Sequence, residues 1–451
     1  MEFTELGACP LPPGDLSFWT PRAATAAWRD DRRTPPLAHA RHVHGAAAAG
    51  RSLVDPAWVG LAFRLGPVAP SAVGAALTAW LRAHEHLRSR LVPGERERTR
   101  LVLPARALSL QRGYIGRFAD PSAMRRQIEA CFDRATRPLD WPQVAFATVE
   151  SAEGVLVLLA ADHGVVDGTT LAMTGGEVRG LLAHPAPAAR GPGYIDFGVY
   201  ERRLVETAVR PALDPGRWHD LLAAGGGAPP GFPLPLGPSA AAPQQSLYRW
   251  LLDAPAAARF AAAARAAGGS TAAGLLACLA LAARATAGTP VLRTVTLTDA
   301  RPTPWRDATG WFVGLHPVAV PVPPEAGFPA VVAAAAAELR DRAPGPGSSA
   351  AHLTELLGRE VPLRFVVSCL DVRRVPGTPP RPEDRMLRSR VHAPQEVYLW
   401  FTRSERGVHL SARFPGNPTA RASLGRFIKS TARLAARIAD HGTTGAALAT
   451  V

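Results

Sequence analysis

The sequence predicts an α/β fold of two lobes, an α+β arrangement in two layers. Segments with a helical period alternate with short apolar segments typical of strands, and this alternation occurs in both halves of the chain. A chain of 451 residues is also longer than the chains that usually fold around one hydrophobic core. A stretch rich in Pro and Gly, His184 to Gly193, separates the halves. We therefore expect an N-terminal lobe over residues 1–190 and a C-terminal lobe over residues 191–451.

The N-terminal half begins with a segment rich in Pro and Gly, to about Arg51, for which we expect irregular structure. The expected elements that follow are a helix over Val73–Leu87, a strand over Arg100–Leu103, a helix over Ser122–Cys131, strands over Val144–Val149 and Val155–Ala161, and a helix that Thr169 or Thr170 caps and that ends near Leu182. The strand over Val155–Ala161 is apolar on both faces, so it should lie inside a sheet.

The C-terminal half repeats the alternation after a second loop, Ala223 to Pro243, which we expect on the surface. The expected elements are a helix over Ser270–Ala285, a strand over Val291–Thr298, a helix over Pro329–Arg342, a strand over Leu363–Ser368, a hairpin of Glu396–Thr402 and Val408–Arg413, and a helix over Leu424–His441. The uncharged stretch from Ala266 to Ala283 is mostly Ala and Gly with few Leu, so it predicts a buried core helix and no membrane span.

The composition narrows the classes of function. The net charge of +14 comes almost entirely from scattered arginines, because Lys429 is the one lysine. No basic cluster with interleaved aromatic residues is present, so we expect no nucleic-acid partner; a positive surface suits an acidic protein or an anionic cofactor tail. The four cysteines are far apart in sequence, which disfavours zinc and disulfides and favours the cytoplasm. His39, His42 and His44 lack other ligands at a suitable spacing, so we expect polar surface or strand residues and no metal site.

The candidate catalytic feature is the sequence Asp162-His163-Gly164-Val165-Val166-Asp167-Gly168, which follows the buried strand directly. A loop after such a strand can present the His163 imidazole to a cleft, and an ordinary histidine pKa suits proton removal at neutral pH. Gly168 permits close approach of its backbone N–H to a substrate oxygen. Asp167 could contact His163 or hold the loop through an arginine elsewhere. The pattern is short and also occurs in structural loops.

Seven motifs follow one another along the chain. They are Trp19-Thr20-Pro21 with Trp28 and Pro35-Pro36, Arg82-Ala83-His84-Glu85-His86-Leu87-Arg88, the second half of His-His-x-x-x-Asp-Gly at His163 to Gly168, Tyr194-Ile195-Asp196-Phe197, Asp299-Ala300-Arg301-Pro302, Gly310-Trp311-Phe312-Val313-Gly314, and the segment from Ser368 to Gly377. Motifs of this kind, in this order, resemble those of the condensation-domain superfamily of acyltransferases that use coenzyme A or carrier proteins, and within it the free-standing polyketide-associated branch.

This resemblance implies two chloramphenicol-acetyltransferase-like lobes in a V, with a tunnel between them. It implies that His163 is the general base at mid-tunnel and that Gly168 offers its amide to the oxyanion. Asp167 would be mainly structural, paired with Arg301 across the lobes. The candidates for the tunnel lining are Asp162, Trp311 and Ser368. Two departures from the family pattern are Asp162 in place of the first His and Gly314 in place of Asn, and the second weakens a peptide-forming role. For His84 and His86 we expect packing or solvation rather than catalysis.

The expected function is transfer of an acyl group from a thioester of coenzyme A, or of the phosphopantetheine arm of an acyl or peptidyl carrier protein, to a small-molecule acceptor. The acceptor group, hydroxyl or amine, and the acyl chain stay open. We expect no bound cofactor, because no phosphate-binding glycine loop is present, and we expect a monomer. The alternatives are a condensation-like domain without activity that recruits partner enzymes to an assembly line, and an epimerising relative.

Overall fold

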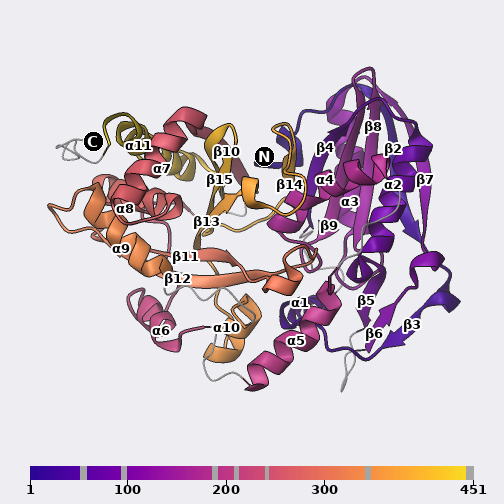
Figure 1. The fold of residues 1–451 in the computed structure, drawn as a ribbon, viewed down its shortest axis with the longest axis horizontal. Coiled ribbons are helices and arrows are strands. Elements are labelled where there is room, and N and C mark those ends of the chain that lie inside the picture. The colour runs from indigo at the N-terminus through magenta and orange to yellow at the C-terminus, as the bar shows by residue number, and fades with distance from the viewer. Residues whose placement is uncertain are drawn as a thin grey trace.

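The computed structural model describes residues 1–50, 58–92, 99–184, 191–207, 213–238, 243–340 and 347–442 (Figure 1). Within these ranges the strands form two large sheets and a small one. The first sheet has the order β1 (Glu2–Glu5), β14 (Arg385–Arg388), β4 (Trp58–Leu65), β9 (Gly154–Asp162), β8 (Val144–Ser151), β2 (Gly14–Arg22) and β7 (Ser109–Phe118). The second has the order β10 (Gln244–Asp253), β16 (Gly407–Pro415), β15 (Val397–Ser404), β13 (Phe365–Asp371), β11 (Val291–Asp299) and β12 (Val313–Pro321). The small sheet has the order β3 (Arg29–Asp31), β6 (Thr99–Val102) and β5 (Ser89–Val92).

The helices follow the strands in both halves of the chain. Those of the first half are α1 (Leu37–Ala49), α2 (Pro70–Ala83), α3 (Pro121–Ala135) and α4 (Gly168–Ala183). Those of the second half are α5 (Tyr194–Thr207), α6 (Pro215–Ala223), α7 (Ala254–Ala266), α8 (Thr271–Ala287), α9 (Phe328–Arg340), α10 (Ala350–Leu357) and α11 (Pro418–His441).

Strand β9 lies at the centre of the first sheet and is buried along its whole length, as its two apolar faces predict. Alternate side chains such as Val157 and Leu159 pack with α2 and α4, while Leu156 and Leu158 pack with α3 on the opposite face. Helices therefore cover both faces of this sheet. The strand is held from both sides, which fixes the position of His163 at its end.

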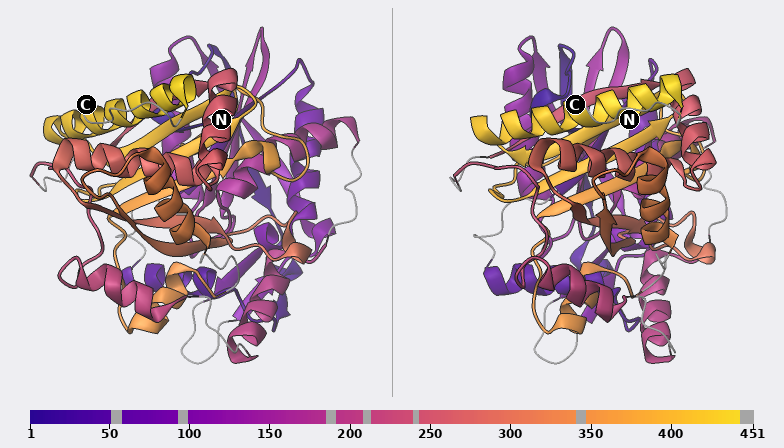
Figure 2. Two further views of the ribbon diagram at one scale, coloured as in Figure 1. Left: turned by 60° about the vertical axis from the view of Figure 1, so that its left-hand side comes forward. Right: turned by 90° about the vertical axis from the view of Figure 1, so that its left-hand side faces the viewer.

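The second sheet packs its outer face against α7, α8, α9 and α11 (Figure 2). Phe365 and Val367 of β13 point into this apolar cluster, and Cys369 packs against it. Ser368 and Leu370 point to the opposite face, and Leu370 packs against the core of the first sheet. The inner face of the second sheet is thus turned toward the N-terminal lobe.

One chain segment crosses back between the lobes. After β13, the chain contributes Val372 and Val375 to the N-terminal core and then adds β14 to the first sheet, between β1 and β4. A single division of the chain between residues 190 and 191, as expected from the sequence, leaves out this segment, because β14 belongs to the first sheet. The second half of the chain thus contributes β14 to the first sheet, so the lobes are connected by backbone hydrogen bonds as well as by side chains.

Several observed elements, among them β4, β7, α7 and β12, were not predicted, and further differences from the sequence-based expectations lie at the N-terminus and at helix ends. The first 50 residues are not irregular, because they hold β1, β2, β3 and α1. The helix predicted over Val73–Leu87 ends at Ala83 and a 3₁₀ turn, Glu85–Arg88, follows. Residues 341–342 of the helix predicted over Pro329–Arg342, and residues 185–190 and 239–242 of the two predicted loops, lie outside the described residues. No single described helix is long and apolar enough to cross a membrane; α7 and α8 qualify only as a pair, bent by 88°.

Candidate active site

His163 follows β9 directly, in the turn that leads into α4. Its Nδ1 lies 3.0 Å from the carbonyl oxygen of Val166. A carbonyl oxygen only accepts hydrogen bonds, so Nδ1 of the neutral ring donates its hydrogen and Nε2 keeps the lone pair. The turn therefore selects the tautomer in which Nε2 can take a proton.

The surroundings of His163 favour the neutral ring. Burial lowers the pKa of His163 below its ordinary 6.5, although backbone hydrogen bonds oppose the shift. The side chain is nevertheless partly exposed, and the indole of Trp311 lies beside it at 5.1 Å between ring centroids. Trp311 belongs to the loop before β12, so the second half of the chain supplies one wall around the imidazole. A neutral, reachable imidazole is suited to act as a general base.

Asp167 is the N-cap of α4, a role that the sequence predicted for Thr169 or Thr170. Its Oδ1 accepts a hydrogen bond of 2.8 Å from the Thr170 amide, and its Oδ2 accepts one of 2.9 Å from the Phe312 amide. Burial alone would raise the pKa of Asp167, but the Arg301 guanidinium and these amides lower it overall. The carboxylate is therefore charged, and its hydrogen bonds join Arg301, Thr170 and Phe312.

Arg301 lies where the resemblance placed it, across the lobes from Asp167. Its Nη2 donates to Asp167 Oδ1 at 2.8 Å and to the Thr170 hydroxyl at 3.0 Å, with both charged side chains 2% exposed. The Thr170 hydroxyl in turn donates to the Gly310 carbonyl at 2.9 Å and accepts from the Gly310 amide at 3.0 Å. These bonds attach the start of α4 to the loop that carries Trp311. They fix the distance between the two walls of the site.

Gly168 is the first residue of α4 and is partly exposed. The Asp167 carboxylate accepts a hydrogen bond from the Thr170 amide, whereas no described residue accepts one from the Gly168 amide. The helix dipole adds partial positive charge at this end. Phe3 bounds the space beside it, since a side-chain carbon added at Gly168 would lie 3.8 Å from the Phe3 ring.

Phe3 also stacks on Trp400 of β15, with ring centroids 5.0 Å apart. Ser368 is the register partner of Trp400 on β13 and lies on the face turned toward the N-terminal lobe. Ser368 thus lies near Trp400, on the Phe3 side of the candidate site. It stays a candidate lining residue.

Asp162 does not line a tunnel, because its side chain is fully buried. Its Oδ1 accepts from the Gly164 amide at 2.8 Å, and the same oxygen lies 2.8 Å from Nε2 of His42. Burial alone would lower the pKa of His42, but the Asp162 carboxylate raises it. Asp162 therefore holds the turn that carries His163 and attaches it to α1.

His42 shows that the expectation for the histidine cluster was wrong. The three histidines lie on α1 rather than on a surface strand; His39 is buried, while His44 is exposed. The His42 ring is also 5.8 Å from that of Trp311, so the indole lies near both His42 and His163. The described residues contain no group of His, Cys, Asp and Glu that could hold a metal ion. Helical spacing of His39 and His42 was the sequence signal that could have placed both on one face.

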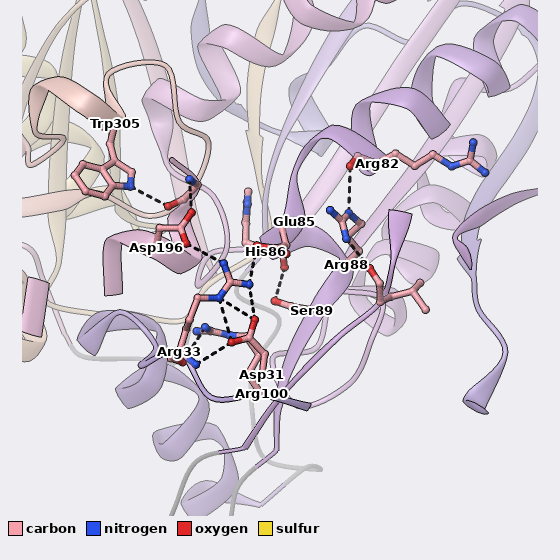
Figure 3. Close-up of polar contacts among 12 residues, drawn as sticks. Asp31, Arg33, Arg82, Glu85, His86, Arg88, Ser89, Arg100, Asp196 and Trp305 are labelled. Atoms are coloured by element: carbon pink, nitrogen blue, oxygen red, sulfur yellow. Dashed lines mark hydrogen bonds and ion pairs between the residues drawn. The ribbon is translucent and has the colours of Figure 1, made fainter. Parts of the chain in front are cut away.

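The motif around Arg82 to Arg88 has a structural role. His84 is buried and lies 2.9 Å from Glu177 and 2.6 Å from the Thr309 hydroxyl, and His86 is buried as well, so both pack as expected. Figure 3 shows Arg33 at the centre of a charged network that joins Glu85 at 2.9 Å and Asp196 at 2.8 Å. This network connects the histidine-containing motif with the motif that begins at Tyr194.

Comparisons with known proteins identify the family. No protein-family model matches the chain. The trehalose-2-sulfate acyltransferase PapA2 of Mycobacterium bovis is 30% identical over 323 residues, which cover 67% of this chain and 68% of that protein. The acyltransferase PapA3 of Mycobacterium tuberculosis is 28% identical and covers 70% of each chain.

Two solved structures show the same fold. A PapA2 acyl transferase matches with a TM-score of 0.79 and 24% identity over 98% of this chain and 100% of the other. The condensation domain of the Monacolin K polyketide synthase MokA matches with a TM-score of 0.68 and 15% identity over 91% of this chain and 98% of the other. The chain therefore belongs to the PapA family of condensation-domain-like acyltransferases.

Proposed function

We propose that the protein transfers an acyl group from a thioester of coenzyme A or of a carrier-protein phosphopantetheine to a hydroxyl or amine of a small-molecule acceptor, with His163 as the general base. The observation that carries the proposal is the hydrogen bond from His163 Nδ1 to the Val166 carbonyl, which leaves Nε2 free to accept a proton. The proposed reaction needs no bound cofactor.

In the proposed reaction His163 Nε2 takes the proton of the acceptor hydroxyl while the oxygen attacks the thioester carbonyl. The carbonyl oxygen gains the negative charge, and the Gly168 amide at the start of α4 donates to it. When this intermediate collapses, the carbon–sulfur bond breaks and the thiolate takes the proton from the His163 imidazolium. The products are an ester and a free thiol, and His163 returns to its neutral form. An amine acceptor would give an amide by the same steps.

The two sides of His163 suggest where the substrates enter. Gly168, Phe3 and Trp400 form an apolar side, which suits an acyl thioester whose carbonyl must reach the Gly168 amide. Trp311 forms the other side, and we assign it to the acceptor. The proposed tunnel would connect these sides past the imidazole, with the lobes held by Asp167 and Arg301.

The test compares His163→Ala with the exposed-residue control His44→Ala. Each purified protein receives a panel of acyl-coenzyme A donors and acylated carrier protein, with matched alcohol and amine acceptors, and free thiol and product mass are measured. Removing a general base is expected to slow transfer about 10²–10⁴-fold, while the control retains the wild-type rate. Transfer by His163→Ala at the full rate would exclude the proposed base. A protein that transfers nothing but forms a stable complex with another enzyme would favour the recruiter alternative.

A further inference from the structure

Helix α11 carries charge of one sign on its outward side. It has 24 residues and lies along the outside of the second lobe, against α7 and α8 (Figure 2). From Pro418 to Ala439 its sequence contains five cationic side chains and no Asp or Glu. Its acidic residue, Asp440, lies at the C-terminal end and pairs with Arg259 of α7 at 3.1 Å. The helix therefore supplies no carboxylate of its own to balance these cations.

Four of the cations form a straight row, which we call the cationic row. They are Arg426, Lys429, Arg433 and Arg437. Steps of three or four residues keep them within about 80° of the helix circumference and over a length of about 16 Å. Arg426, Lys429 and Arg433 are exposed, and none of the three forms a hydrogen bond or an ion pair with a described residue. The row is thus a set of solvated charges without counter-charges on the described surface.

The energetics of the helix itself do not account for the cationic row. Charges of the same sign three or four residues apart on a helix repel each other, so each step of the row is destabilising. The helix dipole favours cations only in the last turn, whereas Arg426 and Lys429 lie in the middle of α11. Helix α3, by comparison, places Glu129 between Arg126 and Arg134. An anionic surface laid against the row removes the repulsion.

The residues beside the cationic row favour a lipid surface over a protein partner. Ala422, Gly425 and Ala436 lie on the same side of α11, and because they are small the cationic side chains extend beyond a flat face. Protein interfaces depend on large aromatic or apolar anchors, and this face of α11 offers none. An anionic bilayer needs only charge, and each Lys or Arg near its surface strengthens binding about fivefold.

The position of α11 also separates the row from the candidate active site. Helix α11 packs on the outer face of the second sheet, whereas Ser368 and Trp400 lie on the inner face. A carrier protein bound at the row would hold its thioester on the other side of this sheet from His163. The row is therefore suited to place the protein on a surface and not to deliver the acyl donor.

We propose that the cationic row binds the protein to the surface of an anionic lipid bilayer, with α11 lying along the membrane plane. The contact is electrostatic and inserts no side chain, so it is reversible and depends on salt. An acyltransferase held there has a bilayer beside it that can take up an acylated product. Binding itself requires no acyl transfer, so it is tested independently of the proposed function.

The test measures how the full-length protein sediments with vesicles. One set contains phosphatidylcholine and phosphatidylglycerol in a two-to-one ratio, and the other contains phosphatidylcholine alone. The wild type should bind only the anionic vesicles. Raising the salt from about 0.1 M to about 1 M should release it, because the Debye length falls from about 10 Å to about 3 Å.

Two triple variants with the same change in net charge locate the contact. Arg426→Gln/Lys429→Gln/Arg433→Gln should bind about 100-fold more weakly, because three cations of the row are lost. The control replaces three exposed arginines in and after α3, and should lose less than the fivefold expected for one cation of the row. It is Arg126→Gln/Arg134→Gln/Arg137→Gln. Both should keep the thermal midpoint of the wild type.

Two further measurements do not depend on removing charge. Arg426→Lys/Arg433→Lys keeps the charge and should bind vesicles like the wild type, whereas a partner that recognises the planar guanidinium groups would be lost. Lys429 is the one lysine of the sequence, so acetylation of its side-chain amine reports on α11 alone. In the wild type, anionic vesicles should slow this acetylation, and phosphatidylcholine vesicles should not.

The proposal is overturned if the wild type ignores anionic vesicles at about 0.1 M salt. Equal losses in the two triple variants would also overturn it, since they would show an effect of net charge alone. Unchanged acetylation of Lys429 on the vesicles would place the contact elsewhere. Tighter binding to a DNA duplex or to polyglutamate than to the vesicles would assign the row to another polyanion. Failure of the proposed function is seen separately, as transfer that survives His163→Ala.

Discussion

Replacing Arg301 with Met should separate the two walls of the active site, because Met fills similar space but leaves the Asp167 carboxylate buried without its cation. Both side chains are 2% exposed, so water cannot replace the lost partner. Breaking a buried ion pair from one side typically costs about 3–5 kcal/mol. Arg301 also donates to the Thr170 hydroxyl at 3.0 Å and to the Ala308 carbonyl at 3.0 Å. Because these bonds are lost as well, we expect the loss of stability to lie toward the upper end of that range.

A double-mutant cycle isolates the ion pair from these other contacts. Asp167→Asn keeps an oxygen that can cap α4 but removes the charge, so Asp167→Asn/Arg301→Met contains no unpaired buried ion. We expect the double variant to be more stable than the sum of the single losses predicts, by about 1–3 kcal/mol.

The assay is urea unfolding at pH 7, followed by tryptophan fluorescence. The pKa of Asp167 is lowered from 3.8 in the folded protein, so the pair contributes fully above pH 3.8 and its contribution is lost as the pH falls below that value. If the losses in the cycle add within about 0.5 kcal/mol, Asp167 and Arg301 are not coupled and the reasoning is refuted. A loss below about 1 kcal/mol for Arg301→Met would refute it as well.

Two further predictions concern the imidazole and the packing of α5. Burial lowers the pKa of His163 from 6.5, so the acid limb of the pH profile of kcat/KM should have its midpoint below pH 6.5; a midpoint above that value contradicts the assigned base. Gly198→Ala would place a carbon 2.3 Å from the Thr34 carbonyl oxygen and 2.5 Å from the Pro36 nitrogen, so it should destabilise the protein by about 1–3 kcal/mol in urea unfolding. Gly180→Ala in α4 meets no neighbour within 4 Å and should stabilise it by about 0.5–1 kcal/mol; equal effects of the two variants would show that α5 is not packed as described.

Elements with a strong local signal could be predicted from the sequence. The strand over Val155–Ala161 is observed as Gly154–Asp162, and the helix over Ser270–Ala285 is observed as Thr271–Ala287 with Ser270 as its cap. The hairpin at Val397–Ser404 and Gly407–Pro415 also lies where its turn predicted it. In each case the apolar pattern and the boundary residues lie within the element itself, so no distant partner was needed to recognise it.

Elements that depend on distant partners could not be predicted. Strand β14 has four residues, and it becomes a strand because β1 and β4 lie on its two sides. Helix α1 begins after two prolines, and its first amide is held by Glu201, which follows it by more than 160 residues. The partner of Asp162 could not be predicted for the same reason, because His42 lies on α1, far from Asp162 in the sequence. These residues acquire their roles through tertiary contacts that a local pattern does not contain.

Asp162, Asp167 and Glu201 are three buried carboxyl groups, and their different partners explain their different roles. Asp167 faces a guanidinium that is always charged, so its anion is permanent and connects the lobes. Asp162 faces His42, and this pair holds the turn that carries His163 to α1. Glu201 has no cation within hydrogen-bond distance among the described residues, so burial keeps it near its midpoint at neutral pH. Glu201 instead accepts a hydrogen bond of 2.8 Å from the Leu37 amide, so it holds the start of α1. The charge of each carboxyl group therefore follows from its partner, which is a guanidinium for Asp167, an imidazole for Asp162 and a backbone amide for Glu201.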